Sequence, residues 1–269
     1  MALRSLDNAL PITPERPKKQ AKILISAHKE KQMADRAFQD PDSKIQGLVG
    51  GLESKDWLKV KVCESLNDVR RFALFHSTLL LPILDKVVSV MVKAMKNPRS
   101  ALIKTSIMAS SDIFKAFGVN LLESTSDAIN QLLLQLLLKA CQDKKFVCEE
   151  ADKALLAMVE AMAPLALLHK LSAYVGHSNL RVRAKAAISI SKMDLKGMEE
   201  FGLVALIQMA ANLLNDKLPE AREATRSIVV SLYEAITESE EEKQEFWQSF
   251  CQSNLPAIHA QAMVKLVYA

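Results

Sequence analysis

Hydrophobic residues recur at helical spacing along most of the chain. Four stretches, at 79–95, 101–117, 127–141 and 148–162, place apolar residues three and four positions apart, which predicts amphipathic α-helices. No segment shows the strict alternation expected of a strand. Turn-forming and helix-capping residues separate the helical stretches, at Asn97-Pro98, Asp143-Lys144, Gly176-His177, Asn215-Asp216 and Pro219. The pattern therefore predicts an all-α fold.

The breaks between these helices repeat along the chain. Each break is a short polar stretch with basic character, followed by an apolar position that opens the next helix. Five such junctions align on Val60, Leu102, Val147, Val182 and Ala221, which are 42, 45, 35 and 39 residues apart. A period of about 40 residues is typical of HEAT and armadillo arrays of paired helices.

The C-terminal segment is expected to form a sixth, capping unit. Its two large aromatic residues, Trp247 and Phe250, would cover the last interface of the array. The predicted fold is an α-solenoid of about six HEAT/ARM-like helical-pair repeats with a disordered N-terminal arm.

The N-terminal residues 1–43 differ from the rest of the chain. They hold four of its nine prolines and little periodic hydrophobicity. Such a segment buries too little surface to offset the entropy lost on ordering. We therefore predict a flexible, basic, proline-containing arm over 1–43 and one repeat domain over 44–269.

A short motif in the arm is a candidate for regulation. The stretch TPERPKK at 13–19 matches the pattern that proline-directed kinases favour, so Thr13 is a candidate phosphosite. A phosphate there would place negative charge beside Arg16, Lys18 and Lys19 and weaken any hold of the arm on an acidic surface. An unmodified solubilising tail and a weak nuclear-import patch are the alternatives for this segment.

Composition and charge narrow the class of partner. The chain has 35 basic and 31 acidic residues, for a net charge of +4, which favours an acidic partner but lacks the strongly basic stripe of a nucleic-acid-binding protein. No signal peptide is expected, because no apolar segment follows the first basic residue. The most apolar stretch, at 129–142, is too short for a membrane span and is interrupted by Gln131 and Gln135. The sequence favours no particular oligomeric state.

Residue patterns that carry catalysis are missing from the sequence. It contains no P-loop, GxGxxG, GxSxG or HExxH motif, and only seven glycines. Cys148 and His177 could form a nucleophile and base in principle, but they fall in different predicted repeats. The four cysteines form no CxxC pair and no zinc-ligand spacing, which indicates free thiols. We predict a protein that is not an enzyme and that uses neither a cofactor nor a metal.

Stacking of the repeats is expected to bring all the junctions to one edge of the array. Each basic or polar residue there is compatible with a solvated helix end, but their recurrence over five junctions suggests a binding edge. The residues expected along it are Trp57, Lys61, Arg99, Ser100, Lys144, Lys145, Asn179, Arg181, Lys217 and Arg222.

Three of these junctions carry motifs of a known family. With KDW in the first junction, RS in the second and VRxxA in the fourth, the region of about 44–269 resembles the TOG domains of microtubule regulators. The similarity is greatest to the CLASP N-terminal type and to the TOG-array regulators of axonemal microtubules. The resemblance implies an edge of junction loops that binds tubulin.

The resemblance also implies a role for each edge residue. Trp57 would place its apolar ring against one tubulin subunit, while Arg99 and Lys145 meet acidic patches and Ser100 helps to fix the second loop. The other subunit would be contacted by Asn179, Arg181, Lys217 and Arg222. An aromatic anchor would supply most of the desolvation, and the basic row would steer the encounter with an acidic partner.

The sequence departs from the family pattern at three places. Pro98 precedes the Arg-Ser pair, Pro219 with Glu220 breaks the fifth junction, and the acidic run at 238–245 follows closely. These features are expected to weaken the far end of the edge. The alternative function is a general HEAT/ARM scaffold for another acidic or regulatory protein, in cell-cycle control or nuclear traffic. We expect a cytoplasmic, cytoskeleton-associated protein, with the nucleus as the alternative location.

Overall fold

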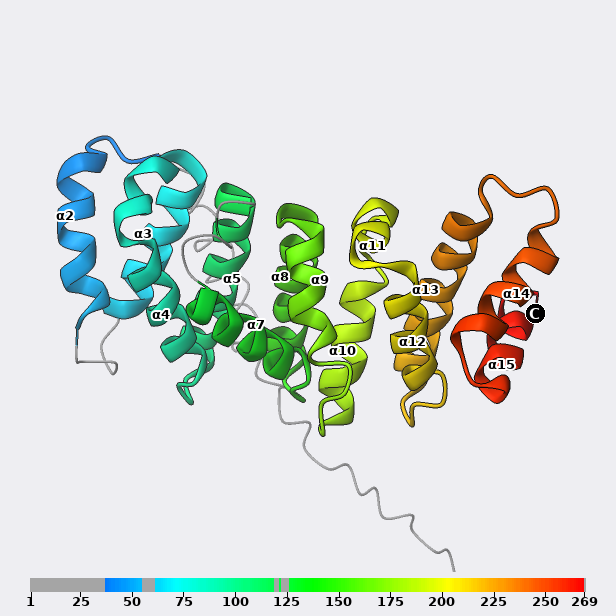
Figure 1. The fold of residues 1–269 in the computed structure, drawn as a ribbon. Helices are drawn as coiled ribbons and strands as arrows, with labels where there is room; N and C mark the ends of the chain where they lie inside the picture. Colours follow the sequence, from blue (N-terminus) through cyan, green and yellow to red (C-terminus); the bar gives the residue numbers. More distant parts are fainter. Residues whose placement is uncertain (1–36, 55–60, 119–120, 122–125, 269) are drawn as a thin grey trace, which may run out of the picture. The chain divides into compact units, whose positions relative to one another are not determined.

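The computed structural model describes residues 37–54, 61–118, 121 and 126–268. The chain divides into two units, Met1–Arg36 and Ala37–Ala269, and the second is described here. All the regular structure in its described residues is helical (Figure 1). The helices are α2 Pro41–Leu52, α3 Lys61–Phe75, η1 Ser77–Ile83, α4 Leu84–Met95, α5 Ser100–Phe117, α7 Ser126–Ala140, α8 Lys145–Ala161, α9 Pro164–Ser172, α10 Leu180–Ile190, α11 Leu195–Phe201, α12 Leu203–Leu213, α13 Pro219–Thr237, α14 Lys243–Asn254 and α15 Ala257–Val267.

The helices pack as consecutive pairs. The pairs in the described residues are α2 with α3, α4 with α5, α7 with α8, α9 with α10, α12 with α13 and α14 with α15. Short connections join the two helices of most pairs, and the pairs follow one another in chain order (Figure 1). These six pairs confirm the predicted α-solenoid.

The second helices of the pairs form two groups. Helices α3, α5 and α8 pack side by side, and so do α10, α13 and α15. Helix α8 packs extensively against α5 but only lightly against α10. The layer of second helices is therefore loosened between the third and fourth pairs.

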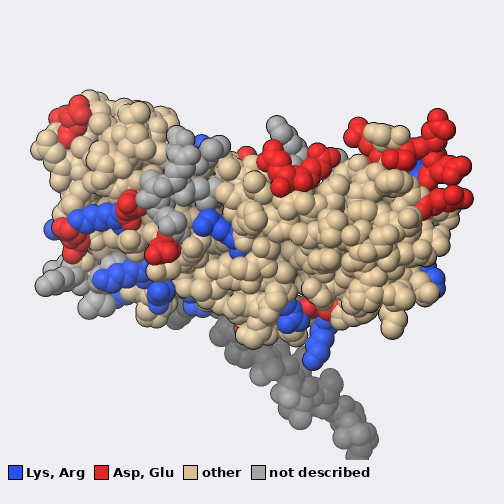
Figure 2. All heavy atoms as spheres, in the orientation of Figure 1, with Lys and Arg blue, Asp and Glu red and all other residues tan. Residues whose placement is uncertain are grey.

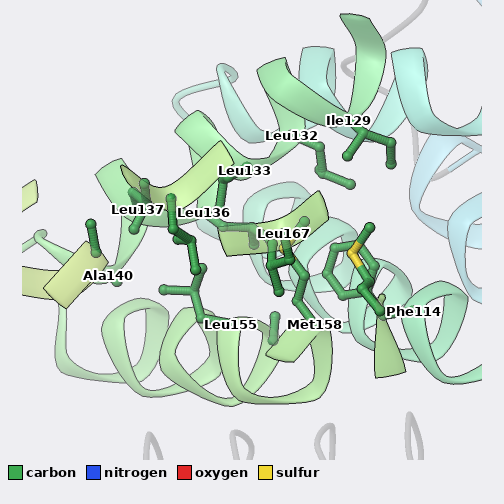
Figure 3. Close-up of a cluster of buried hydrophobic side chains, with 14 of the residues drawn as sticks. Phe114, Ile129, Leu132, Leu133, Leu136, Leu137, Ala140, Leu155, Met158 and Leu167 are labelled. Carbon is green, nitrogen blue, oxygen red and sulfur yellow. The ribbon is translucent and has the colours of Figure 1, made fainter. Parts of the chain in front are cut away.

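The core runs continuously between the two layers. Leucines of α7, such as Leu133, Leu136 and Leu137, point toward Leu155 and Met158 of α8 (Figure 3). These leucines are fully buried, and burial of each such side chain contributes about 1.5–3 kcal/mol.

The last pair closes the array with aromatic residues. Trp247 is fully buried, meets the Tyr233 ring edge-on at 5.6 Å and stacks on Phe250 at 6.0 Å between ring centroids. This packing agrees with the expected capping unit.

Two helix starts differ from the sequence pattern. The helix expected over 79–95 begins as the 3₁₀ segment η1, which contains Pro82, and becomes α-helical only at Leu84. Proline lacks the backbone N–H that an α-helix needs at this position, so the first turns take the tighter geometry. At the other start, α8 opens at Lys145, three residues before the predicted stretch.

Helix α2 begins at Pro41, within the last residues that the sequence assigned to the arm. Asp40 caps the helix by accepting a hydrogen bond from the Ser43 N–H at 3.1 Å, and Phe38 packs against Phe72 at 4.6 Å between ring centroids. Among the described helices, none is both long and apolar enough to cross a membrane.

Candidate protein-binding edge

The second to fifth junctions within pairs lie along one edge of the array, the lower edge in Figure 1. The second to fifth junctions are residues 96–99, 141–144, 173–179 and 214–218. We call these junctions, with the first turn of α3 and the first turns of the helices that follow them, the junction edge. The structure describes the first junction only as far as Ser54, so the predicted anchor Trp57 lies outside the described residues, as does Thr13 of the arm.

The sequence alignment of the junctions corresponds to a common register in space. Leu102, Val147, Val182 and Ala221 are each the third residue of their helix, and each is at most 2% exposed. The third residue of each of these second helices therefore enters the core. The junctions that precede these residues lie at equivalent places in their repeats.

A second position recurs two residues before the helix cap, where the sequence had identified turn residues but not their common place. Asn97 Oδ1, His177 Nδ1 and Asp216 Oδ1 each accept a hydrogen bond from the backbone N–H two residues later, at 3.0, 3.0 and 2.9 Å. Such side chains hold a turn closed ahead of a helix. Their shared place in the alignment, five residues before the buried position, was the signal that could have identified them.

Neighbouring junctions touch one another. Lys144 Nζ of the third junction lies 3.4 Å from Ser100 Oγ at the second. Arg181 Nη1 at the fourth junction donates to the Cys141 carbonyl at 3.0 Å and to Asp143 Oδ1 at 3.1 Å. The structure thus brings predicted edge residues from three repeats into one row.

The fourth and fifth junctions are joined by Arg183, the arginine of the VRxxA motif, for which the sequence predicted no role of its own. Arg183 Nε and Nη2 lie 2.9 and 2.8 Å from Asp216 Oδ2, and Arg183 Nη1 donates to the His177 carbonyl at 3.1 Å. The Asp216 side chain is only 2% exposed. A buried carboxylate needs such partners, since leaving it unpaired would carry a large desolvation penalty.

Several predicted edge residues are exposed to solvent. Lys61, Arg99, Lys145 and Lys217 are exposed, and Lys145, 88% exposed, makes only a long 3.7 Å ion pair with Glu149. A pair of this kind contributes little in water, so the Lys145 ammonium can exchange partners at small cost.

Other predicted edge residues are engaged within the protein. Arg222 Nη1 donates to the carbonyls of Asp216 at 2.7 Å and Lys217 at 3.3 Å, and Asn179 Oδ1 caps α10 by accepting from the Arg181 N–H at 3.0 Å. Asn179 and Arg222 thus shape their loops.

Pro219 and Glu220, the departures at the fifth junction that were expected to weaken the far end of the edge, have different outcomes. Pro219 is the first residue of α13, a favoured place for proline, so it begins the helix and does not disrupt the junction. Glu220 in the same turn is exposed and does add negative charge there.

The acidic run lies away from the junction edge. Residues 238–245 follow the C-terminal end of α13, whereas the fifth junction precedes its N-terminal end. With 19 residues in α13, the two are separated by about 28 Å at about 1.5 Å per residue. Figure 2 shows acidic side chains gathered at the upper edge beside the α13–α14 connection. The acidic run is therefore too far from the junction edge to form ion pairs with its basic residues.

Catalytic or metal chemistry finds no support in the described residues. No group of three or more His, Cys, Asp or Glu side chains there could hold a metal ion. The Cys148 thiol donates to the Ala140 carbonyl at 2.9 Å, and burial followed by the nearby Asp152 charge raises its pKa, which disfavours the reactive thiolate. His177 directs Nδ1 to its own turn.

Comparison with known proteins relates this fold to one family. The family model described as CLASP N terminal matches residues 75–249. The TOG array regulator of axonemal microtubules protein 1 of Mus musculus is 29% identical over 153 residues, which are 57% of this chain and 8% of that protein. The aligned region is thus a small part of that relative.

Solved TOG structures share the fold. A TOG domain of Zyg9 from C. elegans has a TM-score of 0.61 at 16% identity, covering 94% of this chain and 97% of that one. A structure described as "TOG-tubulin binding specificity promotes microtubule dynamics and mitotic spindle formation" has a TM-score of 0.55 at 12% identity, covering 93% and 97%.

Proposed function

We propose that this chain, which belongs to the CLASP N-terminal family, is a microtubule-associated protein that binds tubulin through the junction edge and influences microtubule organisation or dynamics. The observation that carries the proposal is the row of basic and polar side chains from consecutive repeats, joined by the Lys144–Ser100 and Arg181–Asp143 contacts. Such a row presents positive charge to a strongly acidic partner at a spacing fixed by the solenoid.

The edge residues have distinct roles in this proposal. Trp57 is the apolar anchor, and in the junction alignment it occupies the position of the helix caps Arg99 and Lys144. The exposed lysines, among them Lys145 at 88% exposure, attract the acidic surface of tubulin. Arg181 and Arg222 hold their loops in shape through their contacts with junction backbone, and Ser100 is held by Lys144.

The relatives support the choice of partner. One is named as a regulator of axonemal microtubules, and one solved structure is described in terms of TOG–tubulin binding. By the same reasoning we place the protein in the cytoplasm in association with the cytoskeleton. Its function is that of a binding module.

A binding experiment with free tubulin tests the proposal. The full chain and its Trp57→Ala variant are mixed with tubulin and separated by gel filtration at low and moderate salt, beside a microtubule pelleting assay. We expect co-migration of the wild type that weakens as salt screens the exposed charges, and loss of co-migration in Trp57→Ala with an unchanged unfolding midpoint. Absence of wild-type binding in both assays would contradict the proposal.

A further inference from the structure

A trough lies on the face of the second helices, where α8 and α10 pack only lightly. One hollow of about 230 Å³ is lined by Leu155, Leu156 and Val159 of α8 together with Lys185 and Ile188 of α10. A second hollow of about 400 Å³ shares Lys185 and Ile188. The two hollows adjoin at these shared residues, and together we call them the α8–α10 trough.

The second hollow carries the trough toward the junction edge. Its lining includes Cys141, Cys148 and Leu218, together with Arg181 at the fourth junction. One end of the trough therefore lies beside the junction edge, and the other lies on the open face of the second helices.

The trough exists because the two helices differ in length and in partners. Helix α8 has 17 residues and packs along α5, whereas α10 has 11 residues and packs mainly on α13. Leu156 is left 44% exposed, and Val159 and Ile188 are only partly buried. Apolar side chains grouped in a hollow, unlike single ones on a convex surface, indicate a binding site.

Basic side chains of α10 lie along the trough, beside its apolar residues. Arg181, Lys185, Ile188 and Lys192 follow one another at steps of four, three and four residues, which places them on one side of α10 and its C-terminal turn. Lys192 is exposed and has no ion-pair partner in the described part of the chain.

The remaining charges at the trough are largely satisfied. Lys185 Nζ binds both carboxylate oxygens of Asp152, at 2.6 and 2.8 Å, and so bridges α8 and α10. Arg181 pairs with Asp143, while Glu220 gives a negative charge at the end near the junction edge. The unsatisfied positive charge is therefore at the Lys192 end.

We infer that the α8–α10 trough binds a short segment of a partner protein that inserts one large aliphatic or aromatic side chain against Leu156 and Ile188 and pairs a neighbouring carboxylate with Lys192. The 230 Å³ hollow is large enough for such a side chain, since an apolar cavity of about 150 Å³ holds benzene. The site uses none of the exposed lysines of the junction edge and does not depend on tubulin binding.

Selection from random peptides displayed on phage, with the full chain as bait, tests the inference. We expect enriched peptides to carry a large apolar residue close to Asp or Glu. A synthetic copy of one such peptide should shift the methyl NMR signals of Leu156 and Ile188. Its affinity should fall about tenfold in Leu156→Gln, because a polar side chain replaces the apolar contact, and to a similar extent in Lys192→Glu.

Matched variants keep the test specific. Val204→Gln changes a valine of α12 that is 41% exposed, close to the 44% of Leu156, and should leave peptide affinity unchanged. Leu156→Gln should still co-migrate with tubulin, so the trough and the proposed tubulin site can fail separately. Absence of enriched peptides, enrichment of basic ones, or binding that Leu156→Gln leaves unchanged would each overturn the inference.

Discussion

Two arginines on α10 show how much the surroundings decide what a residue contributes. Arg181 and Arg183 are two positions apart, yet the Arg181 side chain is 62% exposed and pairs with Asp143, which is 95% exposed, whereas Arg183 pairs with the buried Asp216. The sequence predicted Arg181 as an edge residue, whereas Arg183 entered only as part of the VRxxA motif. The missing information was the partner, which lies 33 residues away in the next repeat.

The first prediction concerns these two ion pairs. Arg183→Ala leaves the Asp216 carboxylate buried without its cation and should lower the free energy of unfolding by about 3 kcal/mol, whereas Arg181→Ala should change it by less than about 1 kcal/mol. Urea unfolding followed by circular dichroism measures both. Equal effects of the two variants would show that Arg183 does not tie the fourth junction to the fifth.

The second prediction concerns the buried thiol of Cys251. Burial raises the pKa of Cys251 to about 12. The folded protein therefore contains very little of the reactive thiolate at about pH 8. Iodoacetamide should modify Cys251 only after unfolding by urea, as read by mass spectrometry. Because the folded pKa lies above the ordinary value of 9.0, the stability from this group is present below about pH 9 and should be lost as the pH rises toward 12. Rapid labelling of Cys251 in the native protein would contradict this assignment.

At the scale of helices, hydrophobic periodicity predicted which positions of each helix are buried, but it did not predict the hollows that remain between helices. The aligned positions Leu102, Val147, Val182 and Ala221 are buried at the same step of their helices, because hydrophobic spacing directly reports which side of a helix faces the core. The 3₁₀ start at η1 depended on the backbone of Pro82. The α8–α10 trough exists because two helices from different repeats pack only lightly against each other. The hydrophobic pattern within a single helix does not predict this.

The third prediction concerns the end of α5. Gly118 has φ of +41°, and a Cβ atom there would lie 2.6 Å from the Ala161 carbonyl oxygen. Gly118→Ala should therefore destabilise the protein by about 1–3 kcal/mol through backbone strain and this clash. Gly176→Ala is the control, because nothing lies within 4 Å of the added Cβ. Comparison of thermal unfolding midpoints tests this, and a Gly118→Ala midpoint as high as that of the control would contradict it.

At the scale of the array, charges of opposite sign are separated. The junction edge carries exposed lysines such as Lys61, Lys145 and Lys217, and the acidic residues 238–245 lie beyond the far end of α13. The sequence alone suggested interference between them, since it records their distance along the chain and not along a helix axis. Their closeness in the sequence therefore led to an overestimate of the electrostatic interaction between the two groups of charges.

The same separation favours one orientation for an acidic partner. An acidic surface is attracted to the junction edge and repelled from the edge that carries residues 238–245. The array over the described residues presents one such edge, and binding through one site lacks the avidity of linked sites. We therefore expect modest, salt-dependent affinity for tubulin.

The most direct test of the central claim compares two lysines of α8. Lys145 lies at the junction edge and is 88% exposed, while Lys153 lies two turns further along and is 69% exposed. Each forms an ion pair with a glutamate, so a change to glutamate alters the net charge equally in both. Tubulin affinity measured by titration should fall about tenfold, or about 1.4 kcal/mol, in Lys145→Glu and stay close to wild type in Lys153→Glu. Equal losses in the two variants would show that tubulin responds only to net charge, and a larger loss in Lys153→Glu would place the binding surface on the face of the second helices.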